Sequence, residues 1–196
     1  MIIWLNGPFG AGKTTTVREL LKASPGLVEL DTELLGYALR PALASRHPVG
    51  DFQEWPAWRR LVVTALTELA RADVGDVVVP QTVVVEEYWE EITGALLAHG
   101  IQVVAVTLHV DLAEHLRRIE SDMLSRPEDD AGRVPAARWR RERRRDYDSA
   151  LPWLRAKTYV LDTTAISPED VAEAVLAAVP RGFSTNLRCS QPSRPR

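Results

Sequence analysis

The chain has 196 residues, of which 45% are hydrophobic and 26% are charged, the ordinary balance of one globular domain. Its 24 Lys and Arg residues against 27 Asp and Glu residues leave a formal net charge of −3, which argues against a general nucleic-acid-binding surface. A lone Cys189 cannot form an internal disulfide, and no apolar run approaches the roughly 20 residues of a membrane span. The first predicted strand also leaves no room for a signal peptide. We therefore expect a cytoplasmic protein.

The first predicted elements are a buried strand at residues 2–5 and a helix at residues 14–23, joined by a glycine-rich segment. Residues 7–14 match the complete pattern G-x-x-x-x-G-K-[ST], the phosphate-binding loop or P-loop. Its glycines let backbone N–H groups point at phosphate oxygens, and the helix adds its positive N-terminal end. A glycine-rich turn without function is the alternative, and the strand–loop–helix context disfavours it.

Each side chain of this loop has an expected role in nucleotide binding. Lys13 would reach the β- and γ-phosphates and act in catalysis, and the Thr14 hydroxyl would bind Mg²⁺. The residues predicted to hold ATP are Gly7, Phe9, Gly10, Ala11, Gly12, Lys13, Thr14 and Thr15. The sequence therefore predicts ATP and Mg²⁺ as ligands.

Strands and helices alternate along the rest of the chain. Further strands are predicted at residues 27–30, 77–79, 101–108 and 159–161, and further helices at residues 33–43, 56–72, 86–99, 112–124, 135–150 and 168–179. This order predicts an α/β P-loop NTPase, with a parallel five-stranded sheet covered by helices on both faces. The charged loop at residues 125–133 favours a nucleoside-monophosphate-kinase-like protein with a helical lid at about residues 125–150. We expect one domain at residues 1–179 and a disordered tail at residues 180–196.

Candidate catalytic residues outside the P-loop lie at a strand end and in the lid. Asp31 follows the second predicted strand, and ligands bind at the carboxyl ends of strands in such sheets. It could accept a proton from a substrate hydroxyl or hold Mg²⁺ through water, or it could simply cap the next helix. Arg118 and Arg126, near the lid loop, could stabilise charge on the transferred phosphoryl group, although each could equally be a solvated surface residue.

The phosphoryl acceptor is expected in the stretch between the second and third strands. Aromatic side chains crowd this stretch and could stack a base or hold an apolar chain, although they could also simply close the core. The residues predicted to bind the acceptor are Asp31, Tyr37, Arg40, Phe52, Trp55, Trp58, Arg59, Gln81 and Thr82.

The arginine-rich segment at residues 138–145 could be interpreted as a nucleic-acid-binding arm. Nearby acidic residues favour local ion pairs instead, so we predict a lid helix and no nucleic-acid partner. Two other motifs are missing from the sequence. The third predicted strand ends in Pro80-Gln81 rather than in an Asp, and no Asn-Lys-x-Asp motif is present, which argues against a motor ATPase and a regulatory GTPase.

Four stretches of the chain resemble the tunicamycin-resistance proteins. They are residues 1–14, residues 36–40, the pair Asp51-Phe52-Gln53 and Trp58-Arg59, and residues 79–83. The resemblance implies an ATP-binding protein of nucleoside-monophosphate-kinase type that confers resistance to a nucleoside antibiotic with a fatty acyl tail. It places Lys13 and Thr14 in the nucleotide site, and it places Asp31 at the position of the family's candidate acid on the acceptor side. The family's founding member ends in a basic amphipathic helix, which the proline-broken residues 180–196 cannot form, so peripheral membrane association is not expected.

Three functions are compatible with these observations. The first is an ATP-dependent kinase that phosphorylates a hydroxyl of tunicamycin or a similar nucleoside compound. The second is a metabolic small-molecule kinase, and the third is an ATP-gated protein that sequesters the drug without chemistry. The missing acid after the third strand keeps the third function open. The sequence leaves the acceptor hydroxyl and the oligomeric state undetermined.

Overall fold

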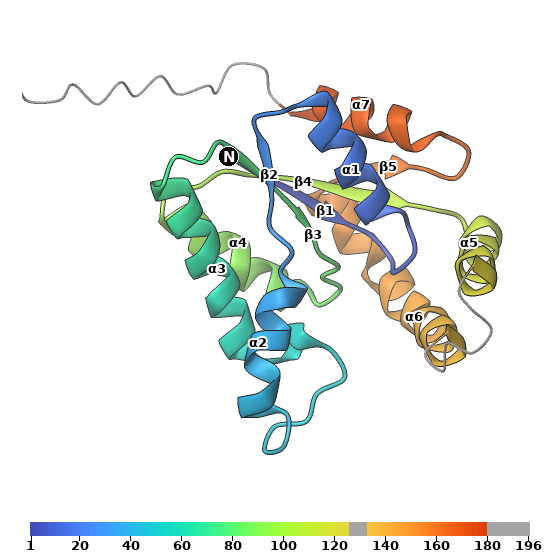
Figure 1. Ribbon diagram of the computed structural model, residues 1–196, viewed down its shortest axis with the longest axis horizontal. Helices are drawn as coiled ribbons and strands as arrows, with labels where there is room; N and C mark the ends of the chain where they lie inside the picture. Colours follow the sequence, from blue (N-terminus) through green and yellow to red (C-terminus); the bar gives the residue numbers. More distant parts are fainter. Residues whose placement is uncertain (126–132, 180–196) are drawn as a thin grey trace, which may run out of the picture.

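The computed structural model describes residues 1–125 and 133–179, in which a parallel sheet lies between two layers of helices (Figure 1). The strand order in space is β2-β3-β1-β4-β5, and every neighbouring pair is parallel. The strands are β1 (Ile2–Asn6), β2 (Leu27–Glu29), β3 (Asp76–Pro80), β4 (Val103–His109) and β5 (Tyr159–Asp162). The predicted fold class, a parallel five-stranded sheet of the P-loop type, is therefore confirmed.

Helices cover both faces of this sheet, as the right-handed connection of parallel strands requires. In Figure 1, α1 and α7 lie together over one face, and α3 and α4 lie over the other. The helices are α1 (Lys13–Ala23), α2 (Glu33–Leu43), α3 (Pro56–Arg71), α4 (Glu86–Ala98), α5 (Leu112–Ser125), α6 (Arg133–Lys157) and α7 (Pro168–Ala178), and a short 3-10 turn, η1, spans Phe52–Glu54.

The middle strand β1 is buried on both faces, and successive side chains point in opposite directions. Ile3 and Leu5 pack in the cluster that includes side chains of α1 and α7. Ile2 and Trp4 pack in a second cluster with Trp58 of α3 and with α4. This burial anchors the strand that leads directly into the P-loop.

The helix α6 differs most from its prediction, because it continues to Lys157 instead of ending near residue 150. Tyr147, Ala150 and Leu154 recur at helical spacing, and each is at most 2% exposed. Pro152 stands on the exposed side of the helix, where the chain tolerates its missing N–H. Packing of these three side chains therefore stabilises the helix beyond Pro152, although a proline usually ends or kinks a helix.

Two further expectations concern the lid and the tail. The helices α5 and α6, which flank the predicted lid loop, contact each other. The loop itself, including Arg126, and the tail at residues 180–196 lie outside the described residues. In the two ranges that the structure covers, no helix has both the length and the hydrophobicity to cross a membrane.

Candidate active site

The P-loop connects β1 to α1 and takes its shape from three glycines with positive φ. Gly7, Gly10 and Gly12 have φ values of 138°, 94° and 97°, a region that side-chain-bearing residues rarely adopt. At Gly7 a Cβ would also lie 2.5 Å from the carbonyl oxygen of Leu108 in the neighbouring strand. Thr14 and Thr15 follow on the exposed first turn of α1. The backbone of residues 7–12 and the helix N-terminus thus form one phosphate-sized cradle.

The ammonium of Lys13 is held inside this loop. It donates hydrogen bonds to the carbonyl oxygens of Gly7 and Pro8, at 3.0 and 3.1 Å, and to the Thr82 hydroxyl at 2.7 Å. Burial lowers the pKa of Lys13 from its usual 10.5 to about 7, although Glu33 and Asp51 act in the opposite direction. A phosphate group in the loop would supply a negatively charged partner for this cation and so favour its protonated form.

Buried polar side chains tie the P-loop to the ends of β2 and β3. The Asn6 carboxamide oxygen accepts the N–H groups of Gly7 and Val83, at 2.8 and 3.1 Å. The Thr32 hydroxyl donates to the Gln81 side chain at 2.7 Å, and the Thr82 hydroxyl donates to the Gly7 carbonyl at 2.8 Å. Sequence-distant loops are therefore fixed relative to the Lys13 ammonium.

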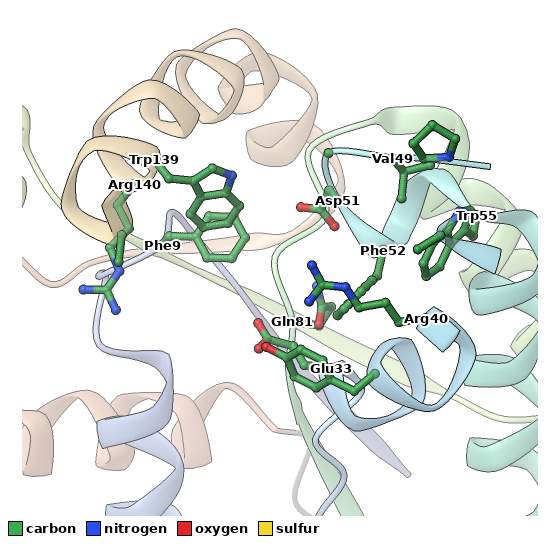
Figure 2. A pocket seen from close by; sticks show the side chains of 15 residues that line it. Phe9, Glu33, Arg40, Val49, Asp51, Phe52, Trp55, Gln81, Trp139 and Arg140 are labelled. Carbon is green, nitrogen blue, oxygen red and sulfur yellow. The ribbon is translucent and has the colours of Figure 1, made fainter. Parts of the chain in front are cut away.

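A cavity of about 590 Å³ opens beside the loop, between α2, η1 and α6. We call it the aromatic cavity. Figure 2 shows Phe9 and Trp139 on one side of it and Asp51, Phe52 and Trp55 on the other, with Glu33 and Gln81 between them. The predicted acceptor residues that line it are Tyr37, Arg40, Phe52, Trp55 and Gln81, and Phe9 reaches it from the P-loop.

The aromatic walls of this cavity are packed in fixed orientations. Phe52 stacks against Trp55 with 5.6 Å between ring centroids and meets Tyr37 edge-on at 5.2 Å. Its ring lies against Gly36 of α2, where a Cβ would be 2.1 Å from a ring carbon. On the other side, Phe9 and Trp139 meet edge-on at 4.3 Å. A planar group could enter between the two walls and contact aromatic faces or edges on both sides.

The acid after β2 that lines the aromatic cavity is Glu33 rather than Asp31. Glu33 lines the aromatic cavity, and Lys13 and Arg140 act on it electrostatically. Burial and the neighbouring Asp31 raise the pKa of Glu33 above its usual value. Asp31 itself lies one residue before the N-cap Thr32, and its carboxylate accepts the backbone N–H of Glu33 at 2.9 Å. The sequence reasoning missed Glu33, although its place in the first turn of a helix that follows a strand end was a usable signal.

Trp139, Arg140 and Asp51 are three more cavity residues that were not predicted as site residues. Arg140 also forms an ion pair with Asp122 of α5, so it connects α5 and α6 at the cavity wall. The lone tryptophan within an arginine-rich helix was the available signal for Trp139. Asp51 lines the cavity while its Oδ1 accepts the N–H of Gln53 at 3.1 Å.

The structure corrects the predicted roles of Trp58 and Arg59. Trp58 is 0% exposed in the core, and its indole N–H donates to the Thr32 carbonyl at 2.9 Å. Arg59 donates to Glu91 and to the main-chain carbonyl of Gln53, both at 2.6 Å. Neither side chain lines the aromatic cavity, so both support its wall from beneath. The buried Thr82 likewise positions Lys13 rather than reaching the cavity.

A second cavity, of about 610 Å³, borders the glycine side of the P-loop, and we call it the loop cavity. It is lined by Gly10 to Gly12, by Thr15, by Arg117 and Arg118 of α5, and by the segment after β5 at residues 163–166. Arg118 donates to the carbonyl oxygens of Ala11 and Thr163, at 3.3 and 2.7 Å, and pairs with Glu114. The Arg118 guanidinium thus lies in the wall of the loop cavity.

The end of the P-loop also offers a ligand for the predicted Mg²⁺. Within residues 1–125 and 133–179, no three or more His, Cys, Asp and Glu side chains gather into a metal site. The exposed Thr14 hydroxyl at the start of α1 is a hard oxygen ligand beside the phosphate cradle. Mg²⁺ keeps several waters and commonly takes the rest of its ligands from substrate phosphates. The residues present therefore fit an ion that arrives with the nucleotide.

Comparison with known proteins agrees with this geometry. Residues 2–147 match the family model described as an AAA domain, whereas no curated protein sequence is significantly similar to the chain. The chain is similar to the tunicamycin resistance protein of Deinococcus radiodurans, with 30% sequence identity, a TM-score of 0.67, and coverage of 90% of this chain and 93% of that chain.

Two kinases share the fold at lower identity. A gluconokinase from Sinorhizobium meliloti has 16% identity and a TM-score of 0.60, with coverage of 90% of this chain and 89% of that chain. The APS kinase of Mycobacterium tuberculosis, solved with AMPPNP and APS, has 19% identity and a TM-score of 0.53, with coverage of 90% and 95%. At these identities the likeness establishes the P-loop kinase fold alone.

Proposed function

We propose that the chain is an ATP-dependent kinase. The premise is that it belongs to the AAA-domain family of P-loop kinase-type proteins and to the tunicamycin-resistance proteins. Its acceptor would be a hydroxyl group of a nucleoside compound such as tunicamycin. This proposal goes beyond family membership, because it assigns both the reaction and the kind of acceptor.

One observation carries the proposal: two cavities of different chemistry meet at the same phosphate loop. Gly10 to Gly12 line the loop cavity, whereas Phe9 lines the aromatic cavity. With phosphates on the loop, the rest of ATP fits the loop cavity beside Arg118. The acceptor then fits the aromatic cavity, and its hydroxyl approaches the γ-phosphate from the side of Glu33 and Lys13. Separate cavities on either side of the transferred group are what a transfer between two bound substrates requires.

The proposed reaction uses few groups of the protein. The acceptor oxygen bonds to the γ-phosphorus as the bond from that phosphorus to the β,γ-bridging oxygen breaks, which releases ADP. Glu33 takes the hydroxyl proton, and its raised pKa makes it a stronger base than an ordinary carboxylate. Lys13 and the backbone N–H groups of the P-loop stabilise phosphate charge. When bound through Thr14, Mg²⁺ would neutralise further phosphate charge.

The direct test is mass spectrometry of tunicamycin after incubation with the protein and Mg-ATP. We expect a gain of one phosphoryl group, with ADP formed in equal amount, and no gain with the Lys13→Ala variant. A folded wild-type protein that binds tunicamycin and leaves it unmodified would overturn the kinase assignment.

One observation favours sequestration as the second candidate. β3 is followed by Gln81 and not by an acid, and the amide of Gln81 is engaged by Thr32 and by the Thr82 carbonyl. A protein that needs ATP only to close around the drug could dispense with that acid. The same experiment separates the two candidates, because sequestration predicts ATP-dependent binding of an unchanged compound.

A further inference from the structure

Phe9 is the residue at which the lining of one cavity gives way to that of the other. Its ring lines the aromatic cavity, whereas Gly10, the next residue, lines the loop cavity. The Lys13 ammonium lies 5.3 Å from the centroid of this ring, and Lys13 does not belong to the described lining of either cavity. The ring, rather than the cation, therefore faces the space proposed for the acceptor.

The helices α5 and α6 both hold Phe9 in this position. Its main-chain carbonyl accepts a hydrogen bond from the Nε2 of His115 in α5, at 2.7 Å. Its ring meets Trp139 of α6 edge-on, with 4.3 Å between ring centroids (Figure 2). Trp139 in turn lies under the Arg143 guanidinium, which is 5.7 Å from its ring centroid and is bonded to Asp146. The contact between the two rings is thus supported from the loop on one side and from α6 on the other.

Core packing does not explain why these two rings are here. In the part of the chain that the structure describes, Phe9 and Trp139 belong to none of the three buried hydrophobic clusters, and each residue is only half-buried. Two large apolar side chains beside a phosphate loop keep apolar surface in contact with solvent, which is unfavourable. A function at the loop would account for their position.

The chemistry of phosphoryl transfer supplies such a function. ATP at the loop can also react with water: a water oxygen bonds to the γ-phosphorus as the bond from that phosphorus to the β,γ-bridging oxygen breaks. The products are ADP, inorganic phosphate and a proton. The aromatic cavity, with a volume of about 590 Å³, has room for many water molecules when no acceptor fills it. A kinase loses ATP to this side reaction unless water is kept from the γ-phosphate.

We infer that Phe9 and Trp139 form a hydrophobic shield over the phosphate loop, and that this shield selects the acceptor hydroxyl over water. While the two rings are in contact, they cover Lys13 with apolar surface that offers a water molecule no hydrogen-bond partner. An acceptor whose planar part packs against the rings displaces the remaining water and brings its own hydroxyl to the loop. The inference rests on the proposed function and deepens it, because it assigns the residues that couple ATP cleavage to transfer.

The test measures how much of the cleaved ATP ends on the acceptor. ADP, inorganic phosphate and phosphorylated tunicamycin are quantified at saturating tunicamycin, and phosphate release is measured again without it. Phe9→Leu and Trp139→Leu each remove one ring and keep an apolar side chain. Trp153→Leu is the matched control, because Trp153 is also a half-buried tryptophan of α6 with an aromatic partner, Trp89, but lines neither the aromatic cavity nor the loop cavity.

We expect both shield variants to raise phosphate release without tunicamycin by about two- to tenfold, because the loss of one aromatic contact shifts the shield toward its open arrangement by that factor. With tunicamycin, the amount of phosphorylated product per ADP should fall below the wild-type ratio, whereas Trp153→Leu should keep that ratio. A merely structural role of the rings would lower hydrolysis and transfer together. An unchanged ratio in both shield variants would therefore overturn the shield while the kinase assignment stands. If the wild type forms no phosphorylated tunicamycin, the kinase assignment and the shield both fail.

Discussion

The Nε2 atom of His115 lies 2.7 Å from the carbonyl oxygen of Phe9, so the helix α5 is bonded to the phosphate loop. The same helix holds the loop one turn later, where Arg118 donates to the carbonyl of Ala11. The other ring nitrogen of His115 is buried and has no hydrogen-bond partner in the described part of the chain. The contact needs a proton on Nε2, and the buried, unpartnered Nδ1 disfavours a second proton on the ring.

The first prediction concerns stability in acid. Burial lowers the pKa of His115 below its usual value of 6.5. The unfolded chain therefore binds a proton at His115 before the folded chain does, and the free energy of unfolding falls as the pH drops below about 6.5. Urea titrations between about pH 7.5 and 5 should show a smaller decrease for His115→Gln than for the wild type. The partly buried His109, whose pKa burial also lowers, is present in both proteins and cancels from the comparison. Parallel curves would show that His115 does not titrate differently on folding.

The second prediction concerns proton uptake on nucleotide binding. Because the pKa of Lys13 is about 7 and phosphates favour its charged form, binding at about pH 8.5 should take up a proton. Nucleotide affinity should then fall as the pH rises above about 7, until the pH reaches the pKa of the bound form. Calorimetric titration with a non-hydrolysable ATP analogue in buffers of different ionisation enthalpy counts the protons. Lys13→Arg, which keeps a permanent charge, should abolish the uptake. Equal uptake in that variant would place the titrating group elsewhere.

The third prediction separates the two acids after β2. Glu33→Gln should lower kcat by about 10²- to 10⁴-fold, the usual contribution of a general base, with little change in ATP affinity. Asp31→Asn should leave kcat within about tenfold of the wild type, since the Asn carboxamide oxygen can accept the same Glu33 N–H. The reverse order of effects would return the catalytic role to Asp31 and make Glu33 a binding residue. Steady-state phosphorylation of tunicamycin is the assay for both variants.

The fourth prediction uses the glycine under the aromatic wall. A methyl group in Gly36→Ala would overlap the Phe52 ring, so Phe52 must leave its place between Tyr37 and Trp55. We expect a loss of roughly 1–3 kcal/mol in unfolding free energy and weaker acceptor binding, with nucleotide binding retained. Gly94→Ala is the matched control, because its Cβ would meet nothing within 4 Å on a helix, and it should stabilise by up to about 1 kcal/mol. Thermal melts and paired ligand titrations measure both effects. Unchanged acceptor affinity in Gly36→Ala would remove Phe52 from the binding wall.

The order of elements could be predicted because it depends on local patterns. The P-loop at residues 7–14 and the apolar strands around it determine a parallel sheet with a phosphate cradle at its carboxyl edge. Most element ends also follow from local signals, such as Ser167 capping α7. The end of α6 could not be predicted, because Tyr147 and Leu154 stabilise the helix past Pro152 only through contacts with distant segments.

By itself, then, the sequence determined the nucleotide loop, the family resemblance and the stretch that lines much of the aromatic cavity. The tertiary structure decided which side chains of that stretch face the cavity. Trp55 precedes α3 with an extended backbone and lines the cavity, whereas Trp58, in the first turn of α3, is fully buried in the core. Likewise Glu33 lines the cavity, whereas Asp31 is bonded to the start of α2. Trp139 reached Phe9 only because α6 folds back over a loop 130 positions earlier in the chain, a proximity that no local pattern encodes.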